Sequence, residues 1–332
     1  MKKIIALTIL FLLVLSGVVA ATTTDLFSAL SNDSKASADS VRSISSKLKD
    51  EINQGTYWGE SALTYAIRYC NEDVVMAILE NRYVDVNLGN SYDTTPLLAE
   101  LGRDSDARVG VVKALIEKGA DPNSGTSWGY PPLQYAAAYC DEEILYALLE
   151  SPLIDINITD TYGKTVLLAE LGRDSKARIG VVEALIDGGI NPNMGTSWGY
   201  SPAEYAIAYC SEEIALRVLA SKYIDVNLLD EYGKTPLLVA LSQDSNCSVR
   251  IVQALINLNA NPNIGQSWGL NAVDYAKRYC STEVYNLVLQ HTATYDPNKV
   301  PEGLEIDTSI YGTVQYGTQT IVLYKDGTYE IR

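Results

Sequence analysis

The chain has 332 residues, 47% of them hydrophobic, and carries 41 acidic against 25 basic side chains, which gives a net charge of −16 at pH 7. Such a charge repels phosphate backbones over long distances and argues against nucleic acid as a partner. The composition is otherwise that of an ordinary folded chain, with enough residues to bury a large core.

The N-terminus has the layout of a secretory signal peptide. Lys2 and Lys3 precede a long apolar run, which ends near the small residues Ala20 and Ala21. This order of charge, apolar core and cleavage site is typical of export signals. We expect residues 1–21 to be removed and the mature protein to be secreted or periplasmic. The alternative is an uncleaved membrane anchor, since the run is just long enough to span a bilayer.

Residues 22–53 are expected to form a degenerate N-terminal capping repeat. Val41, Ile44 and Leu48 keep the spacing of a helix. The serine-rich surface of this segment suits a cap, because the outer face of a terminal repeat has no neighbour to cover it. The alternative is a disordered linker.

From residue 54 onward the sequence repeats itself every 70 residues, which indicates a repeat architecture. Each of these units divides in two, since an aromatic residue before a turn recurs at alternating steps of 34 and 36 residues. The aromatic residues of this series are Trp58, Tyr92, Trp128, Tyr162, Trp198, Tyr232 and Trp268. A Tyr-Cys pair also returns every 70 residues, beginning at Tyr69, Tyr139, Tyr209 and Tyr279.

Within one repeat the apolar residues follow two short helices. In the first repeat Leu63 and Ile67 share one face of the first helix, and Val74 and Ile78 share one face of the second. Neither helix can bury such a stripe alone, so neighbouring copies must stack and cover each other. The even-numbered repeats carry extra residues between the two helices, as in 102–108. We therefore expect a mainly α-helical solenoid.

Two motifs resemble those of ankyrin repeats. Thr95-Pro96-Leu97 and Thr235-Pro236-Leu237 are similar to the family's Thr-Pro-Leu-His opening of the first helix, and residues 117–123 resemble its repeat ending. These motifs recur in register, so the chain is identified as carrying seven ankyrin-type repeats over residues 54–298. The histidine of the opening motif is replaced in every repeat, which puts the cross-repeat hydrogen bonds that it makes in the family in doubt.

The resemblance also implies where a partner binds. The aromatic residue before each turn corresponds to the fingertip contact face, and the end of each first helix lines the concave groove. Rigid aromatic rings offer a large contact area at little entropic cost, so we expect the chain to bind a protein or peptide partner. We expect the chain itself to be a monomer. The alternative is that each ring packs on its neighbouring finger, and both roles can hold together. The candidate residues are Trp58, Tyr69, Tyr92, Trp128, Tyr130, Tyr139, Tyr162, Trp198, Tyr200, Tyr209, Tyr232, Trp268 and Tyr279.

No motif indicates an enzyme, a cofactor or a metal site. The one histidine, His291, is expected to be structural or exposed, and no phosphate-binding loop or nucleophile elbow occurs. Glu100 and Glu170 occupy a position that is alanine in other repeats, and Arg103 and Arg173 follow them at the spacing of a local ion pair. The alternative function is a glycan-binding or glycan-processing envelope protein that uses the tryptophan row and these glutamates. Glu100 and Glu170 lie two repeats apart, which corresponds to roughly 20 Å. This distance exceeds the separation between the two catalytic carboxyl groups of a glycosidase, which argues against hydrolysis.

The four cysteines of the Tyr-Cys pairs lie two repeats apart, roughly 20 Å, which is too far for disulfides among them. We expect them to be small, half-buried thiols. The alternative is a disulfide between Cys247, in the longer loop of the sixth repeat, and Cys210 or Cys280 one layer away.

After residue 298 the repeats end and β-forming residues take over. Asp326-Gly327 lies between two such stretches and predicts a hairpin, and Tyr311 and Tyr316 indicate a further strand. We expect residues 299–332 to dock on the last repeat as a small β C-terminal cap, because so small a sheet is not stable alone. The alternative is a free strand edge that adds to a partner.

Overall fold

The computed structural model describes most of the chain after the predicted signal peptide, which itself lies outside the described residues. Those residues are 22–31, 35–54, 59–125, 129–173, 176–195, 197, 199–243, 247–265 and 269–299, with the backbone alone of 312–316, 319–323 and 329–331. The contacts divide the chain into two compact units, residues 1–154 and 155–332.

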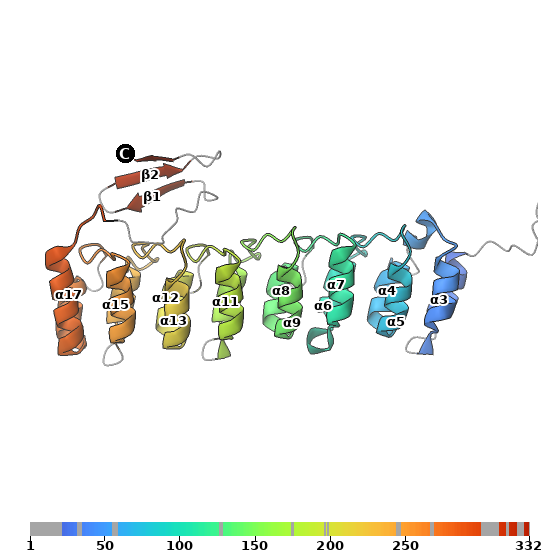
Figure 1. Cartoon of the computed structure of the whole chain (residues 1–332), viewed down its shortest axis with the longest axis horizontal. Helices are drawn as coiled ribbons and strands as arrows, with labels where there is room; N and C mark the ends of the chain where they lie inside the picture. The colour runs from blue at the N-terminus through green and yellow to red at the C-terminus, as the bar shows by residue number, and fades with distance from the viewer. Residues whose placement is uncertain are drawn as a thin grey trace, which may run out of the picture. The chain divides into compact units, whose positions relative to one another are not determined.

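The first unit is built from short helices that form hairpins in sequence order (Figure 1). Their bounds are α2 Thr23–Leu30, α3 Ala38–Ser45, α4 Ala62–Tyr69, α5 Glu72–Leu79, α6 Pro96–Leu101, α7 Val109–Glu117, α8 Pro132–Tyr139 and α9 Glu142–Leu149, with 3-10 turns at Asp50–Asn53 and Asp104–Asp106. The first helices α4, α6 and α8 pack on one another in turn, and so do the second helices α5, α7 and α9. The pair α2 and α3 packs on α4 and α5 in the place of a preceding repeat.

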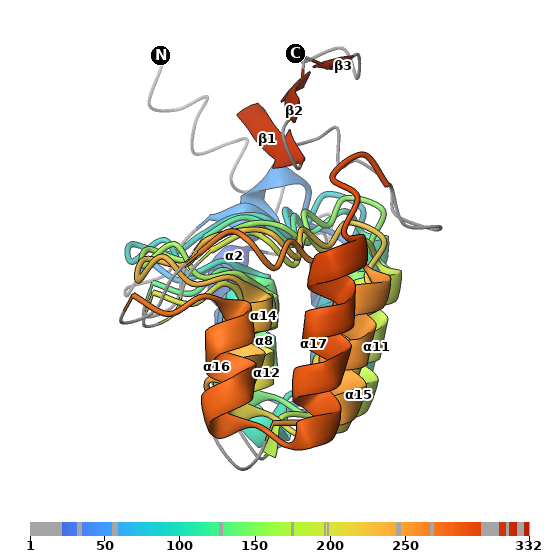
Figure 2. The same cartoon turned by 90° about the vertical axis from the view of Figure 1, so that its left-hand side faces the viewer.

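The second unit continues the same pattern. Its helices are α10 Val166–Leu171, α11 Ile179–Asp187, α12 Pro202–Tyr209, α13 Glu212–Leu219, α14 Pro236–Leu241, α15 Val249–Asn257, α16 Ala272–Tyr279 and α17 Thr282–Thr294. Figure 2 shows α12, α14 and α16 side by side in one layer and α11, α15 and α17 in the other. The two layers bury the apolar stripes that each helix presents.

The Thr-Pro-Leu motif explains how the first helices of the second and sixth repeats begin. Thr95 is the N-cap of α6, where its hydroxyl accepts the N–H of Leu98 at 3.3 Å, and Pro96 occupies the first helical position. Proline is suited to that position, because its ring fixes φ near the helical value and its missing N–H has no helical partner there. Leu97 and Leu98 are then buried between the layers.

The Tyr-Cys pair marks the end of the first helix in the odd repeats. In the first repeat the N–H of Cys70 donates to the carbonyl of Ala66 at 2.9 Å, and the backbone of Cys70 is extended. The second helix starts two residues later with Glu72 and Asp73, and acidic side chains there interact favourably with the positive end of the helix dipole. The turn is therefore short, and its cysteine directly follows the last residue of the first helix, Tyr69.

Within each unit, an asparagine at the end of a repeat joins that repeat to the next one. The Oδ1 atom of Asn87 accepts the N–H of Asp121 at 2.7 Å, and its Nδ2 donates to the carbonyl of Gly119 at 2.9 Å. Asn193 makes the corresponding pair of bonds in the second unit. Neighbouring repeats are thus hydrogen bonded to each other although the histidine of the family motif is absent.

Three antiparallel strands follow the last helix, in the order β1-β2-β3. Their bounds are β1 Gly312–Tyr316, β2 Gln319–Leu323 and β3 Tyr329–Ile331. The predicted turn at Asp326-Gly327 lies outside the described residues, between β2 and β3. The role of this sheet as a cap stays a prediction.

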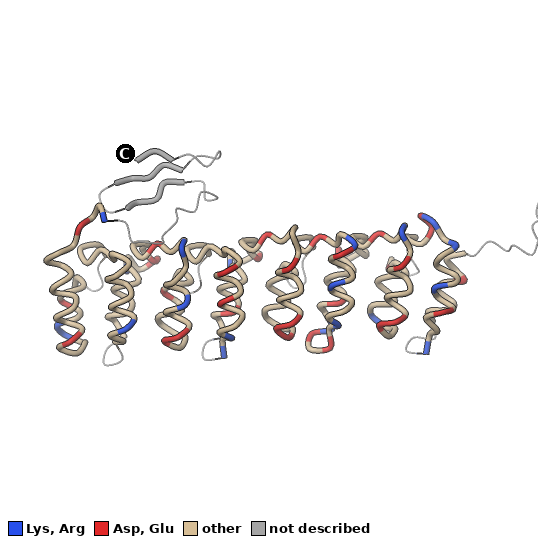
Figure 3. Tube along the Cα trace, in the orientation of Figure 1, with Lys and Arg blue, Asp and Glu red and all other residues tan. Residues whose placement is uncertain are grey.

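Charged residues are spread over the structure. Acidic and basic positions are interspersed along the described helices and loops of both units (Figure 3). Among the described residues, no helix combines the length and apolar character that a membrane crossing requires.

Candidate partner-binding surface

The described fingertips each carry an exposed tyrosine. Tyr92, Tyr162 and Tyr232 are 83%, 75% and 61% exposed. The next residue has a positive φ in each case, 60° at Asp93 and 74° at the glycines of the other two. This left-handed backbone makes a tight turn that holds the ring at its apex. The candidates at the equivalent position of the odd repeats, Trp58, Trp128, Trp198 and Trp268, lie outside the described residues.

Tyrosines also come in pairs at the ends of the first helices in the odd repeats. The outer tyrosine of each pair is 40–51% exposed, whereas the inner one, a helical turn earlier, is buried or half-buried. The ring centroids within each pair are 4.8–5.3 Å apart. The inner tyrosines were missed from the sequence, although their i, i+4 spacing to the outer ones was the available signal. The pairs are Tyr65–Tyr69, Tyr135–Tyr139, Tyr205–Tyr209 and Tyr275–Tyr279.

Tyr130 and Tyr200 connect the fingers to these helix ends. Tyr130 lies edge-on to Tyr139 at 6.2 Å between centroids, and Tyr200 lies edge-on to Tyr209 at 5.9 Å. Tyr200 is also 6.0 Å from the fingertip ring of Tyr232. Burial raises the pKa of the Tyr200 hydroxyl to about 12, and the neighbouring Tyr209 adds to this shift. Tyr200 thus packs on the neighbouring finger, whereas Tyr130 packs on the first helix of its own repeat.

A pocket of about 500 Å³ opens among the tyrosines of the second unit. Tyr200 and Tyr209 line it from the fifth repeat, and Tyr275 and Tyr279 line it from the seventh. Lys234 of the sixth repeat is its one charged lining residue among those described. The pocket is therefore aromatic and rich in hydroxyl groups.

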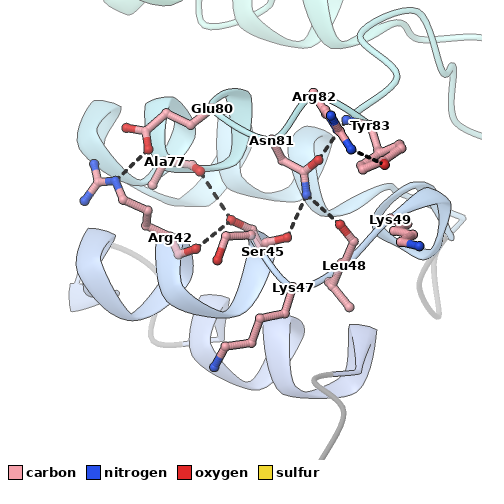
Figure 4. A pocket seen from close by; sticks show the side chains of 11 residues that line it. Arg42, Ser45, Lys47, Leu48, Lys49, Ala77, Glu80, Asn81, Arg82 and Tyr83 are labelled. Atoms are coloured by element: carbon pink, nitrogen blue, oxygen red, sulfur yellow. Dashed lines mark hydrogen bonds and ion pairs between the residues drawn. The ribbon is translucent and has the colours of Figure 1, made fainter.

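A second pocket, of about 470 Å³, lies in the first unit where the N-terminal helix pair meets the first repeat (Figure 4). Asn81 donates to the carbonyls of Ser45 and Leu48 at 2.6 and 3.0 Å, and Arg42 donates to Glu80 at 2.7 Å. The hydrogen bond from Arg42 holds the pKa of the Glu80 carboxyl below its usual value. These hydrogen bonds around the pocket join the N-terminal helix pair to the first repeat.

Glu100 is fully buried and forms ion pairs both with the Arg103 that the sequence indicated and, more closely, with Arg108. Arg103 lies at 3.7 Å, whereas Arg108 is the main partner and donates to both carboxylate oxygens and, through its backbone N–H, to Oε1 at 2.7 Å. The same guanidinium donates to the carbonyls of Ile67 and Cys70 in the preceding repeat, at 2.9 and 3.1 Å. The pair therefore anchors the long loop of the second repeat to the turn of the first.

The fourth repeat contains a copy of this ion pair. Glu170 is fully buried and accepts from Nε and Nη2 of Arg178 at 3.1 and 2.6 Å, while the predicted partner Arg173 lies at 3.8 Å. A carboxylate that is buried and held by an arginine is not placed to reach a substrate. The arrangement explains how two carboxylates are tolerated at a packing position.

The sixth repeat uses a disulfide in the same loop. Cys247 and Cys280 are bonded, with their Cα atoms 5.8 Å apart. The expectation that all periodic cysteines are thiols is therefore wrong for Cys280, because the long loop of the sixth repeat reaches forward to the turn of the seventh. Cys70, Cys140 and Cys210 remain thiols and lie 3.8, 3.5 and 3.5 Å from the backbone carbonyls to which they donate.

Two further titratable side chains have structural roles. His291 is buried, and its Nε2 lies 2.7 Å from the carbonyl oxygen of Ala260, which is a structural role. Glu204 is buried in a capping box with Ser201, and burial raises the pKa of its carboxyl to about 7. Within the described part of the chain, no three His, Cys, Asp or Glu side chains come close enough to hold a metal ion.

Family models agree with the geometry of these helix pairs. Models described as ankyrin repeats in three copies match residues 133–230 and 175–264, and a model described as many copies of ankyrin repeats matches residues 105–149. Residues 105–264 therefore carry ankyrin repeats. Its fold is an ankyrin-repeat solenoid, and proteins of this kind are generally non-catalytic modules for protein–protein interaction.

Several curated proteins share these ankyrin repeats. A putative ankyrin repeat protein of Rickettsia felis is 28% identical over 204 residues, which cover 60% of this chain and 50% of that protein. The human Transient receptor potential cation channel subfamily A member 1 is 28% identical over 159 residues, 48% of this chain and 14% of the channel subunit. ANK repeat-containing protein nipk-1 of Caenorhabditis elegans is 28% identical over 177 residues, 48% of this chain and 28% of that protein. The chain spans half or less of the length of these relatives.

Among solved structures, the ankyrin repeat domain of Bcl-3 superposes with a TM-score of 0.52 at 19% identity, over 70% of this chain and 99% of that domain. At this identity the likeness shows the ankyrin fold and nothing of a shared partner.

Proposed function

We propose that the mature chain is an exported, non-catalytic ankyrin-repeat protein that binds a protein or peptide partner through its exposed tyrosines. The observation that carries this proposal is the outer tyrosine of each pair, which is 40–51% exposed while it rests on an inner tyrosine one turn earlier. A ring supported in this way is already ordered, so a partner that covers it gains contact area at little loss of entropy. The fingertip tyrosines Tyr92, Tyr162 and Tyr232 extend the same kind of surface.

Export is proposed from the N-terminal charge, apolar run and small residues, and capping of the last repeat is proposed for the strands β1 to β3. Cell fractionation with N-terminal sequencing tests export. A mature chain that starts near residue 22 in the envelope or the medium supports it, and a chain with an intact Met1 in the cytoplasm refutes it.

The binding surface is tested with two variants of the mature chain. In one, Tyr69, Tyr139, Tyr209 and Tyr279 are replaced by serine. In the other, the exposed leucines Leu153 and Leu229 are replaced by serine, which removes apolar surface elsewhere on the molecule. Circular dichroism first establishes that both variants are folded.

Each chain is then used to capture cross-linked proteins from the envelope and the growth medium. A partner that the parent and the leucine variant retain, and that the tyrosine variant loses, supports the proposal. A partner that all three chains hold equally contradicts a tyrosine surface.

The glycan alternative gains nothing from Glu100 and Glu170, because both carboxylates are buried in ion pairs. A polysaccharide screen still distinguishes the two functions. A polysaccharide that the parent retains and the double variant Trp128→Ala plus Trp198→Ala loses establishes glycan binding instead.

A further inference from the structure

We propose that Glu204 and Asp230 share a proton, and that this proton holds the finger of the sixth repeat, residues 230–234, against the fifth repeat. The fingertip Tyr232 then takes its position according to pH. The inference rests on the proposed function, because Tyr232 belongs to the proposed binding surface, and it adds the regulation of that surface.

The two carboxyl groups come from the two sides of one boundary between repeats. The N–H of Glu231 donates to the carbonyl of Gly199 at 3.2 Å, so the fingers of the fifth and sixth repeats touch there. Asp230 directly precedes Glu231. On the other side of the boundary, Ser201 caps helix α12 two residues after Gly199. A side chain held at Ser201 therefore lies at the same boundary as Asp230.

The carboxyl of Glu204 is held at this place and has one oxygen left over. Its Oε2 atom accepts the N–H and the hydroxyl of Ser201 at 2.9 and 2.8 Å, and the residue is fully buried. Oε1 has no hydrogen-bond partner among the described residues. Asp230 is in the same condition, since its Oδ1 atom accepts the N–H groups of Tyr232 and Lys234 at 2.8 and 2.7 Å. Its Oδ2 atom is buried without a partner in the described part of the chain.

A single proton can satisfy both oxygens. Ionised carboxyl groups only accept hydrogen bonds, whereas a protonated one also donates. Burial raises the pKa of the Glu204 carboxyl to about 7, and Asp230 adds to this shift, as expected for two like charges at one place. The hydrogen bonds from Ser201 and the charge of Lys234 oppose it. Tyr200, on which Asp230 also acts, has a pKa of about 12 and stays neutral here.

The other charged groups around α12 are in ion pairs or in solvent. Helix α14, which packs on α12, has no charged residue. Helices α10 and α13 also pack on α12, and their charged residues are Glu170, Glu212, Glu213 and Arg217. All but Glu213 are in ion pairs, and Glu213 is exposed, as is Glu231 of the finger. Asp230 and Lys234 are thus the charged groups that act on Glu204.

The odd repeats differ at the position of Glu204. The ankyrin opening motif has histidine there, whereas the first and third repeats have Thr64 and Gln134, which are fully buried and cannot titrate. Asp274 of the seventh repeat is exposed. A buried acid at this position therefore distinguishes the boundary between the fifth and sixth repeats.

Loss of the proton releases the finger. Two ionised oxygens that are buried without donors are costly, and the cost is removed when the finger moves away and water reaches them. Asp230 moves with the finger, since it binds the N–H groups of that turn. Tyr232 then leaves Tyr200, whose ring centroid lies 6.0 Å from its own in the held finger. Because contact with the finger raises the pKa of Glu204, the contact is stable below that pKa and weakens as the pH rises through it.

The test compares amide hydrogen exchange in two fingers of the mature chain at pH 6 and pH 8. The rates are measured by NMR and divided by the intrinsic exchange rate at each pH. With a pKa of about 7, roughly nine-tenths of the Glu204 carboxyl is protonated at pH 6 and one-tenth at pH 8. Protection of the Tyr232 and Lys234 amides is therefore expected to fall about tenfold.

The finger of the second repeat is the internal control. Asn90 accepts the N–H groups of Tyr92 and Thr94 at 2.9 and 3.1 Å, so this turn is built in the same way. Thr64 stands in the place of Glu204, so protection is expected to be the same at both pH values. An equal change in both fingers, or no change in the sixth repeat, overturns the inference.

Two variants assign the effect to the shared proton. Glu204→Gln carries a donor at every pH, and Asp230→Asn supplies one while it keeps the turn, as Asn90 does in the second repeat. In both variants the fall in protection is expected to vanish. Glu231→Gln is the matched control, because it removes an exposed carboxylate from the same finger, and there the fall is expected to remain. A fall that persists in either folded variant, or that Glu231→Gln abolishes, overturns the inference.

The outcome is separable from that of the proposed function, because no partner is present in these measurements. If the finger of the sixth repeat responds to pH but the tyrosine surface captures nothing, the shared proton stands and the binding function falls. If the four-tyrosine variant loses its captured partner but the finger does not respond, the binding function stands and the shared proton falls.

Discussion

Replacement of Glu100 by alanine removes one partner of a buried ion pair and leaves the other behind. The Arg108 side chain is only 13% exposed, and it loses the carboxylate that accepts its Nε and Nη2 hydrogens. The backbone N–H of Arg108 loses its acceptor in the same step. Breaking a buried pair from one side costs about 3–5 kcal/mol, so Glu100→Ala is expected to lower the free energy of unfolding by that amount.

The sixth repeat shows how this loss can be offset. There Ala240 and Ser248 occupy the places of Glu100 and Arg108, so the double variant Glu100→Ala plus Arg108→Ser reproduces a combination that the chain already uses. The double variant gives up two hydrogen bonds to carbonyls of the preceding repeat, worth about 1 kcal/mol each, but it leaves no buried charge. Its expected loss of about 2 kcal/mol is smaller than that of the single variant.

Urea unfolding followed by circular dichroism measures both losses, and amide hydrogen exchange in α6 and α7 assigns them to the second repeat. Glu150→Ala is the control, because Glu150 pairs with Lys113 at 3.4 Å on the surface and such pairs contribute little. The reasoning is refuted if Glu100→Ala costs no more than Glu150→Ala. It is also refuted if the double variant is less stable than Glu100→Ala alone.

Two further changes test other parts of the structure. Ala177→Cys is expected to form a disulfide with Cys210, because these positions match Cys247 and Cys280, whose Cα atoms are 5.8 Å apart. Thiol titration of the oxidised, denatured variant should then find one thiol fewer than in the parent, and one more would contradict the match. Glu204→Gln is expected to remove a pH dependence of stability. The pKa of the Glu204 carboxyl rises from 4.5 to about 7 on folding, so the folded chain keeps a proton that the unfolded chain releases, and the stability of the parent falls by up to about 3 kcal/mol as the pH rises through this window. Urea unfolding at about pH 5 and pH 8 measures the difference, and an equal decrease in the variant would disprove the assignment.

The helix pairs are predictable from local chemistry. Thr95 and Pro96 start α6 as an N-cap and a first helical residue, which the motif indicated. Leu63 and Ile67 are buried where the helical spacing placed them. The capping motif and the apolar spacing each depend on residues within one or two helical turns. Both can therefore be recognised in the sequence of a single repeat, and their recurrence in other repeats supports them.

The closer partner of Glu100, Arg108, was not predictable from the same reasoning, because helical spacing applies only inside a helix. Helix α6 ends at Leu101, with Gly102 as its C-cap. Arg103 therefore lies beyond the helix and not one turn above the glutamate. Arg108 reaches back from the start of α7, eight residues later, and only the path of the intervening loop brings it there.

The tyrosine surface was predictable in part. The outer tyrosines and fingertips follow from the period of the sequence, whereas the pocket of the second unit depends on three successive repeats. Tyr209, Lys234 and Tyr279 lie far from one another in the sequence. They line one pocket only because the fifth, sixth and seventh repeats stack on one another. A single repeat contains no signal for such a site.

The exposed tyrosines and the anchored loops are parts of one arrangement. Each outer tyrosine directly precedes the cysteine of the turn. In the first repeat the carbonyl of Cys70 accepts a hydrogen bond from Arg108, and in the seventh Cys280 is bonded to Cys247. A hydrogen bond in one repeat and a disulfide in another thus hold the same position of the turn. The fold therefore requires that this turn be held in place, and different residues can meet that requirement. A fixed turn fixes the ring beside it, and a partner that binds such rings loses less entropy than one that must order them.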